Sequence, residues 1–375
     1  MARSEKMTSI SPERLRYARE YYGLDINQVE LKIKSIKAVD LLSYEDGNDH
    51  PTYSKLEMLA NLYNRPVLYF FFKLPPKKER LAVAFRSIES EIGQHFDMQI
   101  RIIMEQADLY RINITELFVG QEYPKFFRML ADSSVHSDDG YVAWLRNALE
   151  LSLEKQKQFS KPEDLLEYVR DKLFEIGVYV FKDSFKSNNV SGVCLYDNDF
   201  PIILLNNKTT FTRQVFTVFH ELYHLFRKEP DVYIPELSEE KECDRFASEF
   251  LIPNADLQTK LRGLSNTEDM VLIKDLAREY NVSPSAIAYR LKTKGMISSS
   301  FYKTIHEDGV RRMNSEASGG NYYYTRMSYL GKLYLKRVFD AYYAGSINIV
   351  SVGKYTGMKA AHISKLSSFM FGGEY

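Results

Sequence analysis

Residues 215–226 read Val-Phe-Thr-Val-Phe-His-Glu-Leu-Tyr-His-Leu-Phe and contain the pattern H-E-x-x-H. In a helix, positions four apart lie on one face, so His220 and His224 would both reach a single zinc ion. Glu221 would lie about 100° around the helix from His220, where its carboxylate reaches a metal-bound water and not the metal. The remaining face is apolar and would be buried, at Phe219, Leu222 and Phe226. The alternative is a half-buried helix whose two histidines are satisfied by ordinary hydrogen bonds.

A catalytic zinc ion usually has three protein ligands and one water. The next segment, residues 238–253, begins with acidic residues and ends at a proline, which is typical of a helix. Glu240 and Asp244 are one turn apart there, so a carboxylate ligand and a carboxylate that holds a ligand histidine would share a side. Glu239 is the competing ligand, whereas Glu242 points away from Glu240. The alternative for all three glutamates is that they are solvated residues in the first turn of the helix and do not bind a metal.

The two segments together resemble the ImmA/IrrE metallopeptidases, which are intracellular, gluzincin-like zinc proteins. The resemblance rests on H-E-x-x-H followed by E-x-x-[AC]-[DN]-x-F-A-x-x-[LF]-[LI]-P, and it covers residues 160–296. It implies a Zn²⁺ cofactor held by His220, His224 and Glu240, with Glu221 as the catalytic acid and base.

Two residues depart from this family pattern. Tyr223 stands where a small residue is usual, and Cys243 replaces the usual alanine. A tyrosine at that position would crowd the metal if its ring turned toward it, so activity is in question on this point.

The segment around these motifs predicts a small α+β domain. Residues 162–176 form an amphipathic helix pattern, and three strand-like runs follow at 177–181, 190–196 and 201–205. A helix, a small sheet and a metal-binding helix are expected of a zincin-type peptidase. The run 191–196 is the candidate edge strand, which would pair with the backbone of an extended substrate.

The chain as a whole has 375 residues, room for two or three domains, and equal numbers of basic and acidic residues, 50 each. This balance excludes a global field that would drive binding to nucleic acid. The two cysteines argue against a disulfide framework. No apolar run is long enough to cross a bilayer, and the start of the chain has no signal-peptide pattern. We expect a cytoplasmic protein.

Residues 9–74 resemble a Cro/repressor-type helix-turn-helix domain of the XRE class. The matching positions are Arg19, Gly23, Leu24, Tyr44, Glu45, Gly47, Pro51, Leu56, Leu59 and Ala60. The DNA-binding candidates are Lys37, Ala38 and Ser43, but Asp40 in the recognition segment would repel the DNA backbone. The domain binds DNA or docks a protein partner, and its sequence does not decide between them.

The rest of the chain is predicted to be helical, so the fold class is mainly α with a small α+β zincin-like domain. Residues 81–159 form a helical connecting region, which includes Phe85-Arg86. Residues 273–291 resemble the second helix-turn-helix that this peptidase family commonly carries, and the resemblance implies that it packs on the peptidase body. A flexible connection is expected near 297–324. The helical segment 325–375 is a dimer contact or a third helix-turn-helix.

Three functions are compatible with these patterns. The first is an intracellular zinc endopeptidase which, by the family resemblance, cleaves a transcriptional repressor to derepress mobile-element or stress-response genes. The second is a non-proteolytic regulator or antitoxin that binds DNA or a toxin, with zinc in a structural or sensing role. The third is a peptidase-like fold that has lost activity.

Overall fold

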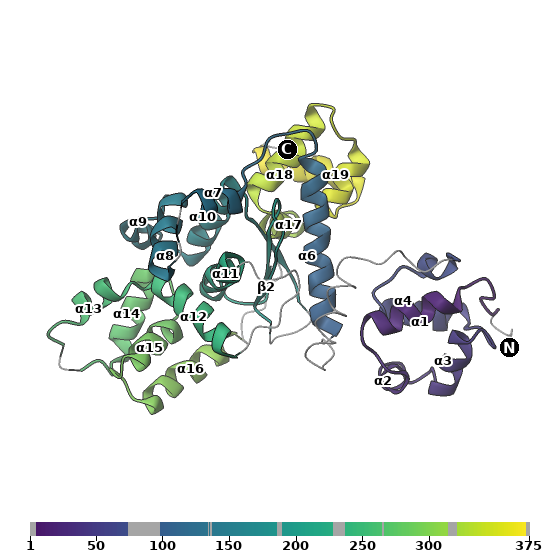
Figure 1. Ribbon diagram of the computed structural model, residues 1–375, viewed down its shortest axis with the longest axis horizontal. Helices are drawn as coiled ribbons and strands as arrows, with labels where there is room; N and C mark the ends of the chain where they lie inside the picture. Colours follow the sequence, from purple (N-terminus) through teal and green to yellow (C-terminus); the bar gives the residue numbers. More distant parts are fainter. Residues whose placement is uncertain are drawn as a thin grey trace. The chain divides into compact units, whose positions relative to one another are not determined.

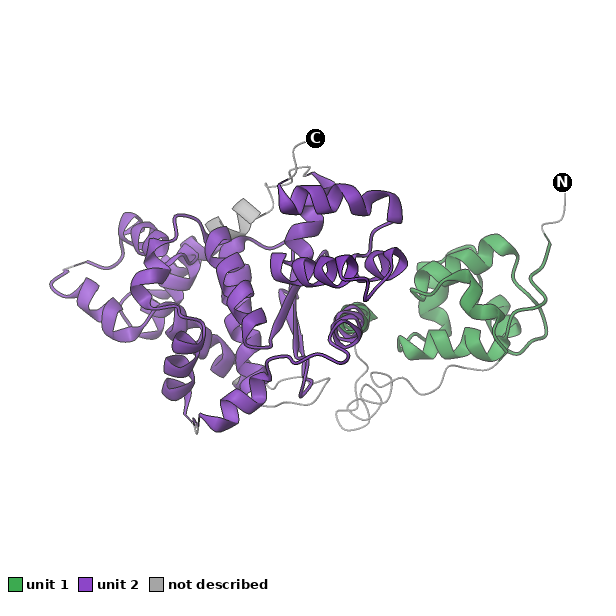
Figure 2. Ribbon diagram, turned by 90° about the horizontal axis from the view of Figure 1, so that it is seen from above, with its two compact units in different colours: residues 1–105 green, residues 106–375 purple. Residues whose placement is uncertain are grey.

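The computed structural model describes residues 5–73, 98–133, 135, 137–185, 190–227, 237–264, 266–313 and 321–372. The chain divides into two compact units, Met1–Glu105 and Gln106–Tyr375, which Figure 2 colours separately. The predicted fold class is confirmed, because the chain is mostly helical with one small sheet (Figure 1). Within the described ranges, no helix is both long and apolar enough to cross a membrane.

Unit 1 is a bundle of short helices around one apolar core. Its elements are α1 (Pro12–Tyr21), α2 (Ile26–Lys32), α3 (Ala38–Glu45), α4 (Tyr53–Leu62) and the 3₁₀ helix η1 (Val67–Phe71). The side chains of Ser11, Asp25 and Thr52 cap α1, α2 and α4 by accepting from backbone N–H groups.

A buried ion pair joins α1 to α3 in this unit. The guanidinium of Arg19 donates to both carboxylate oxygens of Glu45, at 2.7 and 2.8 Å, and Glu45 is only 3% exposed. A two-point contact of this kind fixes the angle between the helices. Both residues belong to the helix-turn-helix signature, but the assignment of this bundle as a Cro/repressor-type domain stays a prediction.

Between η1 and α10 the structure describes α6 (Met98–Leu117), α7 (Phe126–Asp132), α8 (Asp138–Ala148) and α9 (Leu153–Gln158). They account for the described part of the predicted helical region 81–159. Residues 81–97, including Phe85 and Arg86, lie outside the described residues.

The sheet of unit 2 has three strands in the order β1-β3-β2. Helix α10 (Pro162–Glu175) leads into β1 (Tyr179–Asp183), β2 (Gly192–Leu195) and β3 (Ile202–Asn206). The central strand β3 pairs in parallel with β1 and antiparallel with β2. The strand β2 is therefore an edge of this sheet, as the sequence predicted for the run 191–196.

The sheet is followed by the helices that build and support the metal-binding motif. They are α11 (Phe211–Phe226), α12 (Leu237–Leu251), α13 (Asn254–Leu261), α14 (Met270–Tyr280), α15 (Pro284–Thr293) and α16 (Ser299–Met313). Asn281, in the left-handed conformation with φ 57°, ends α14, and Ser283 caps α15. Arg290 of α15 pairs with Glu249 of α12, so α15 packs on α12; the assignment of α14 and α15 as a second helix-turn-helix stays a prediction.

The C-terminal helices differ from the sequence-based expectation. They are α17 (Tyr322–Leu330), α18 (Lys332–Tyr343), α19 (Ile349–Thr356), the 3₁₀ helix η2 (Ala360–His362) and α20 (Ile363–Phe371). A flexible connection near 297–324 was expected, but α16 occupies much of that range. Gly331, with φ 86°, separates α17 from α18.

A buried arginine attaches α17 to the sheet. The Arg170 guanidinium, on α10, donates to the backbone oxygens of Ser328 at 2.7 Å and Tyr329 at 3.1 Å, and also to Val180 O in β1. It satisfies carbonyls at the end of α17 that have no partner within the helix. The C-terminal helices are therefore part of unit 2.

Candidate metal centre

Helix α11 carries the H-E-x-x-H pattern and is almost completely buried on its apolar side. Thr210 caps it by accepting from Arg213 N–H. Phe219 is fully buried, and its ring stacks on Phe250 of α12 at a centroid distance of 4.0 Å. This packing holds α12 alongside α11 and turns the two histidines toward the carboxylates of α12.

Glu240 contacts both histidines. Its Oε2 lies 3.1 Å from His220 Nε2, and its Oε1 lies 3.6 Å from His224 Nε2. Nitrogen and oxygen ligands at 2.0–2.2 Å from a tetrahedral zinc ion are roughly 3.3–3.5 Å apart, so these separations suit a shared divalent ion. The donor set of two imidazoles and a carboxylate also fits zinc chemically. Glu239 stays the competing ligand that the sequence predicted.

Asp244 holds the other side of the His220 ring. Its Oδ1 lies 2.9 Å from His220 Nδ1. When Nε2 binds a metal, Nδ1 carries a proton and donates a hydrogen bond to this carboxylate. The hydrogen bond fixes the orientation of the His220 ring and raises the basicity of the ring. This is the arrangement that the one-turn spacing of Glu240 and Asp244 predicted.

The charges around the histidines favour a cation. Burial lowers the pKa of His220, but its hydrogen bonds to Asp244 and Glu240 outweigh burial and raise that pKa to about 9. Hydrogen bonds from His220 and His224 lower the pKa of Glu240 to about 2. The carboxylate is therefore ionised across the physiological range, and a positive charge between these three side chains is stabilised.

Glu221 faces the edge strand of the sheet. It is 8% exposed, and a Cβ atom added at Gly192 would lie 3.4 Å from Glu221 Oε1 and 2.5 Å from Thr217 Cγ2. The glycine therefore lets β2 approach the helix closely at the carboxylate. The sequence analysis missed this role of Gly192, although a glycine within a strand-like run signals such an approach.

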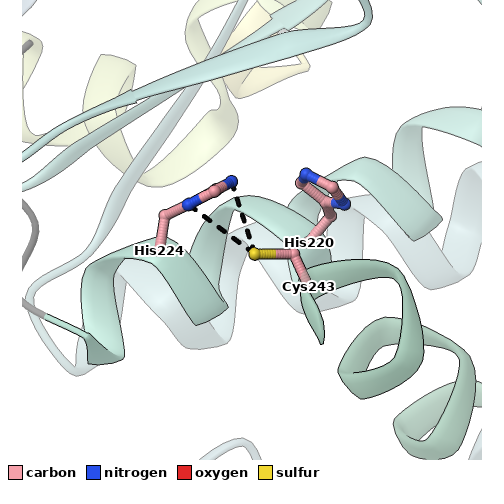
Figure 3. Close-up of side chains that lie close together, drawn as sticks. All are labelled: His220, His224 and Cys243. Atoms are coloured by element: carbon pink, nitrogen blue, oxygen red, sulfur yellow. Dashed lines mark hydrogen bonds between the residues drawn. The ribbon is translucent and has the colours of Figure 1, made fainter. Parts of the chain in front are cut away.

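Cys243 is a second candidate ligand beside the histidines. Figure 3 shows His220 and His224 on one helix and Cys243 on its neighbour, and one ligand atom from each lies within 4.8 Å of the others. The sulfur is 3.4 Å from Nε2 and 3.6 Å from Nδ1 of His224. A sulfur almost equidistant from both nitrogens lies beside the ring and not along the Nε2 lone pair. Glu240, which contacts Nε2 of both rings, stays the third ligand that the family resemblance implies, and Cys243 is the alternative.

Tyr223 turns away from the histidines. Its ring packs against Phe246 at a centroid distance of 4.8 Å, and its hydroxyl donates to Asp138 Oδ1 of α8 at 2.8 Å. Asp138 also pairs with Arg245 of α12 at 2.6 Å. The tyrosine therefore helps to join three helices and does not crowd the metal-binding face.

The other candidates from the sequence lie elsewhere. Glu242 pairs with Arg227 at 3.0 Å, away from the histidines. In unit 1, Lys37 precedes α3 and pairs with Glu30 at 3.1 Å, while Ala38 begins that helix and Ser43 lies half-buried within it. Their role in DNA binding stays a prediction.

The chain was compared with known proteins and with known protein families. No curated protein matches the chain significantly. Residues 175–292, which run from the end of α10 to α15, match the model of the IrrE N-terminal-like domain of peptidase family M78. This segment, with both histidines, Glu240 and the edge strand, is therefore similar to a metallopeptidase domain of the ImmA/IrrE kind.

Proposed function

We propose that the chain is a zinc-dependent endopeptidase. The observation that carries this proposal is the placement of the Glu240 carboxylate against Nε2 of both His220 and His224, with Glu221 beside the edge strand. A structural zinc site has no use for a carboxylate at the position of Glu221, whereas peptide hydrolysis needs a base there.

Each of these side chains would have its own role in hydrolysis. His220, His224 and Glu240 would hold the ion, which when bound supplies an activated water and a Lewis acid for the peptide carbonyl. Glu221 takes the proton from the attacking water and returns it to the leaving amine. Asp244 accepts from His220 Nδ1 and keeps that ring in place during the reaction.

The edge strand β2 would hold the substrate. Its free edge offers backbone N–H and C=O groups for pairing with an extended peptide. Since Gly192 brings this strand against Glu221, a peptide paired there would pass the carboxylate that acts as base. An extended, accessible segment of a protein is therefore the expected substrate.

A transcriptional repressor is the substrate implied by the family resemblance, and its cleavage would derepress mobile-element or stress-response genes. The test uses the purified, zinc-loaded chain and a repressor encoded beside it, with fragments identified by mass spectrometry. The native chain should produce defined fragments, and Glu221→Gln should produce none while it keeps its zinc. Equal cleavage by Glu221→Gln would contradict the proposal.

The position of Cys243 favours one alternative, a regulator or antitoxin with a structural or sensing zinc. A site of two histidines, Glu240 and Cys243 would have four protein ligands and no open position, which is typical of structural zinc. Replacement by alanine distinguishes the two. In the peptidase Cys243→Ala keeps zinc and cleavage, whereas in the closed site it weakens zinc binding.

A further inference from the structure

We propose that the C-terminal helices α18, α19 and α20 form a helix-turn-helix that binds duplex DNA through the start of α20. This inference is independent of the peptidase site. It begins from the uneven charge of the chain: residues 321–372 contain seven basic residues and one acidic residue, whereas residues 5–73 contain ten of each. The basic residues of the C-terminal segment are Arg326, Lys332, Lys336, Arg337, Lys354, Lys359 and Lys365.

The backbone of this segment has the geometry of a helix-turn-helix. Helix α19 ends at Gly357, which has a φ of 63°, and η2 and α20 follow after a short turn. A Cβ atom added at Gly353 would come 3.0 Å from Met358 O, so the helix and the turn approach each other closely there. A Cβ at Gly357 would collide with the Arg326 guanidinium. Both glycines are needed for this tight connection.

The three helices of the motif enclose an apolar core of their own. The side chains buried between the three helices are Tyr334, Leu335, Val338, Phe339, Val352, Tyr355, Met358, Ile363 and Leu366. The hydroxyl of Tyr334 donates to Tyr355 O at 3.0 Å, which ties α18 to α19. A preformed scaffold of this kind presents α20 rigidly.

Several basic residues of the segment have structural partners. Lys354 pairs with Glu116 of α6 at 2.6 Å, Lys336 pairs with Asp340, and Arg337 lies over the Phe118 ring at 4.7 Å. The face that carries Lys354 is therefore fixed to α6 within unit 2 (Figure 1). Lys354 and Arg337 therefore attach the motif to the rest of unit 2, while Lys336 is paired within α18; we do not assign these three cations to the binding surface.

The segment from η2 to the start of α20 presents two further lysines to solvent. Lys359, which precedes η2, and Lys365 of α20 are exposed, and neither makes an ion pair within the described part of the chain, while Lys365 Nζ lies 5.3 Å from the centre of the Tyr323 ring. The exposed residues between them are small or carry a hydroxyl, namely Ala360, Ala361 and Ser364. Small side chains let a helix come close to the groove, while lysines and a helix N-terminus suit phosphates. The chemistry of this surface fits a polyanion.

The recognition helices of the other two helix-turn-helix segments, α3 and α15, carry no exposed lysine. In unit 1 the recognition position of α3 exposes Val39, and Asp40 pairs with Lys55. In α15, Arg290 is paired with Glu249, and Lys292 lies over the ring of Tyr302 of α16 at 4.6 Å. The C-terminal motif is therefore the better DNA-binding candidate.

The test is fluorescence anisotropy of the full chain with a labelled duplex DNA of mixed sequence, about 30 base pairs long, from 50 to 300 mM salt. The native chain should bind at low salt with an affinity that falls linearly on a log–log plot. The double variant Lys359→Ala/Lys365→Ala should bind at least tenfold more weakly at 50 mM salt. Its salt slope should fall by about two, one for each lost phosphate contact.

Two controls make the result decisive. Lys336→Ala removes one paired lysine from the same segment and should leave the affinity within twofold. Lys34→Ala/Lys37→Ala removes two exposed lysines of unit 1 and should also have little effect. The proposal is overturned if the native chain does not bind at 50 mM salt or if the C-terminal double variant matches Lys336→Ala. It is also overturned if only the unit 1 variant loses affinity; in each case Lys359 and Lys365 would serve a protein partner or none.

Discussion

Asp244 Oδ1 lies 2.9 Å from Nδ1 of His220, the ring nitrogen that does not face Glu240. The carboxylate belongs to α12 and the histidine to α11, so this hydrogen bond connects the two helices at the metal centre. Its removal should affect the ion more than the fold, because Asp244 is only partly buried.

Asp244→Ala should weaken zinc binding by about 10- to 100-fold, because the His220 ring loses the partner that orients it and raises its basicity. Competition with a chromophoric chelator measures this change. Glu242→Ala is the matched control, since Glu242 lies on the same helix and pairs with Arg227 instead. Equal zinc affinities for the two variants would show that Asp244 does not support the site.

Zinc affinity should increase with pH up to about 9. In the metal-free chain the pKa of His220 is about 9, so at neutral pH a proton occupies the ring and must leave when zinc binds. Below that pKa each unit of pH should raise the apparent affinity roughly tenfold, with about one proton released per zinc from this group. Isothermal titration calorimetry in buffers of different ionisation enthalpy measures the release. A pH-independent affinity between pH 6 and 8 would be incompatible with this account.

Gly192→Val should abolish or strongly reduce cleavage while zinc stays bound. Any Cβ at this position would come within 2.5 Å of Thr217 Cγ2, so β2 must move away from α11 and from Glu221. Val193→Ala, at the next position of the same strand, is the control and should keep most activity. Zinc content and fragment yield are measured on both variants, and full cleavage by Gly192→Val would rule out the role of β2 in placing the substrate.

Tyr223→Phe should cost about 1 kcal/mol of unfolding free energy and leave zinc binding and cleavage unchanged. The variant loses the hydrogen bond from the Tyr223 hydroxyl to Asp138, which joins α11 to α8. Denaturant unfolding and the cleavage assay measure the two effects. A large loss of cleavage without a change in stability would mean that this hydroxyl serves the reaction.

Much of the metal centre follows from helical periodicity alone. The spacing of His220 and His224, and that of Glu240 and Asp244, are local properties of two helices, so the sequence predicted which side chains share a face. The prediction that Asp244 would hold a ligand histidine agrees with the hydrogen bond between them.

The features that the sequence did not reveal depend on distant contacts. The approach of Gly192 to Glu221 requires β2 to be an edge strand and to pack on α11. The direction of Tyr223 is set by Asp138 of α8, which lies 85 residues earlier. The position of α17 depends on Arg170, which is 158 residues before Ser328. Patterns within a single helix contain none of this information.

The central claim is that the two histidines and Glu240 share one zinc ion and leave a position open for water. Zinc K-edge X-ray absorption of the zinc-loaded chain tests it most directly. The account predicts two imidazoles and oxygen ligands at about 2.0–2.2 Å and no sulfur ligand. A sulfur at about 2.3 Å would place Cys243 on the metal and contradict the open peptidase site.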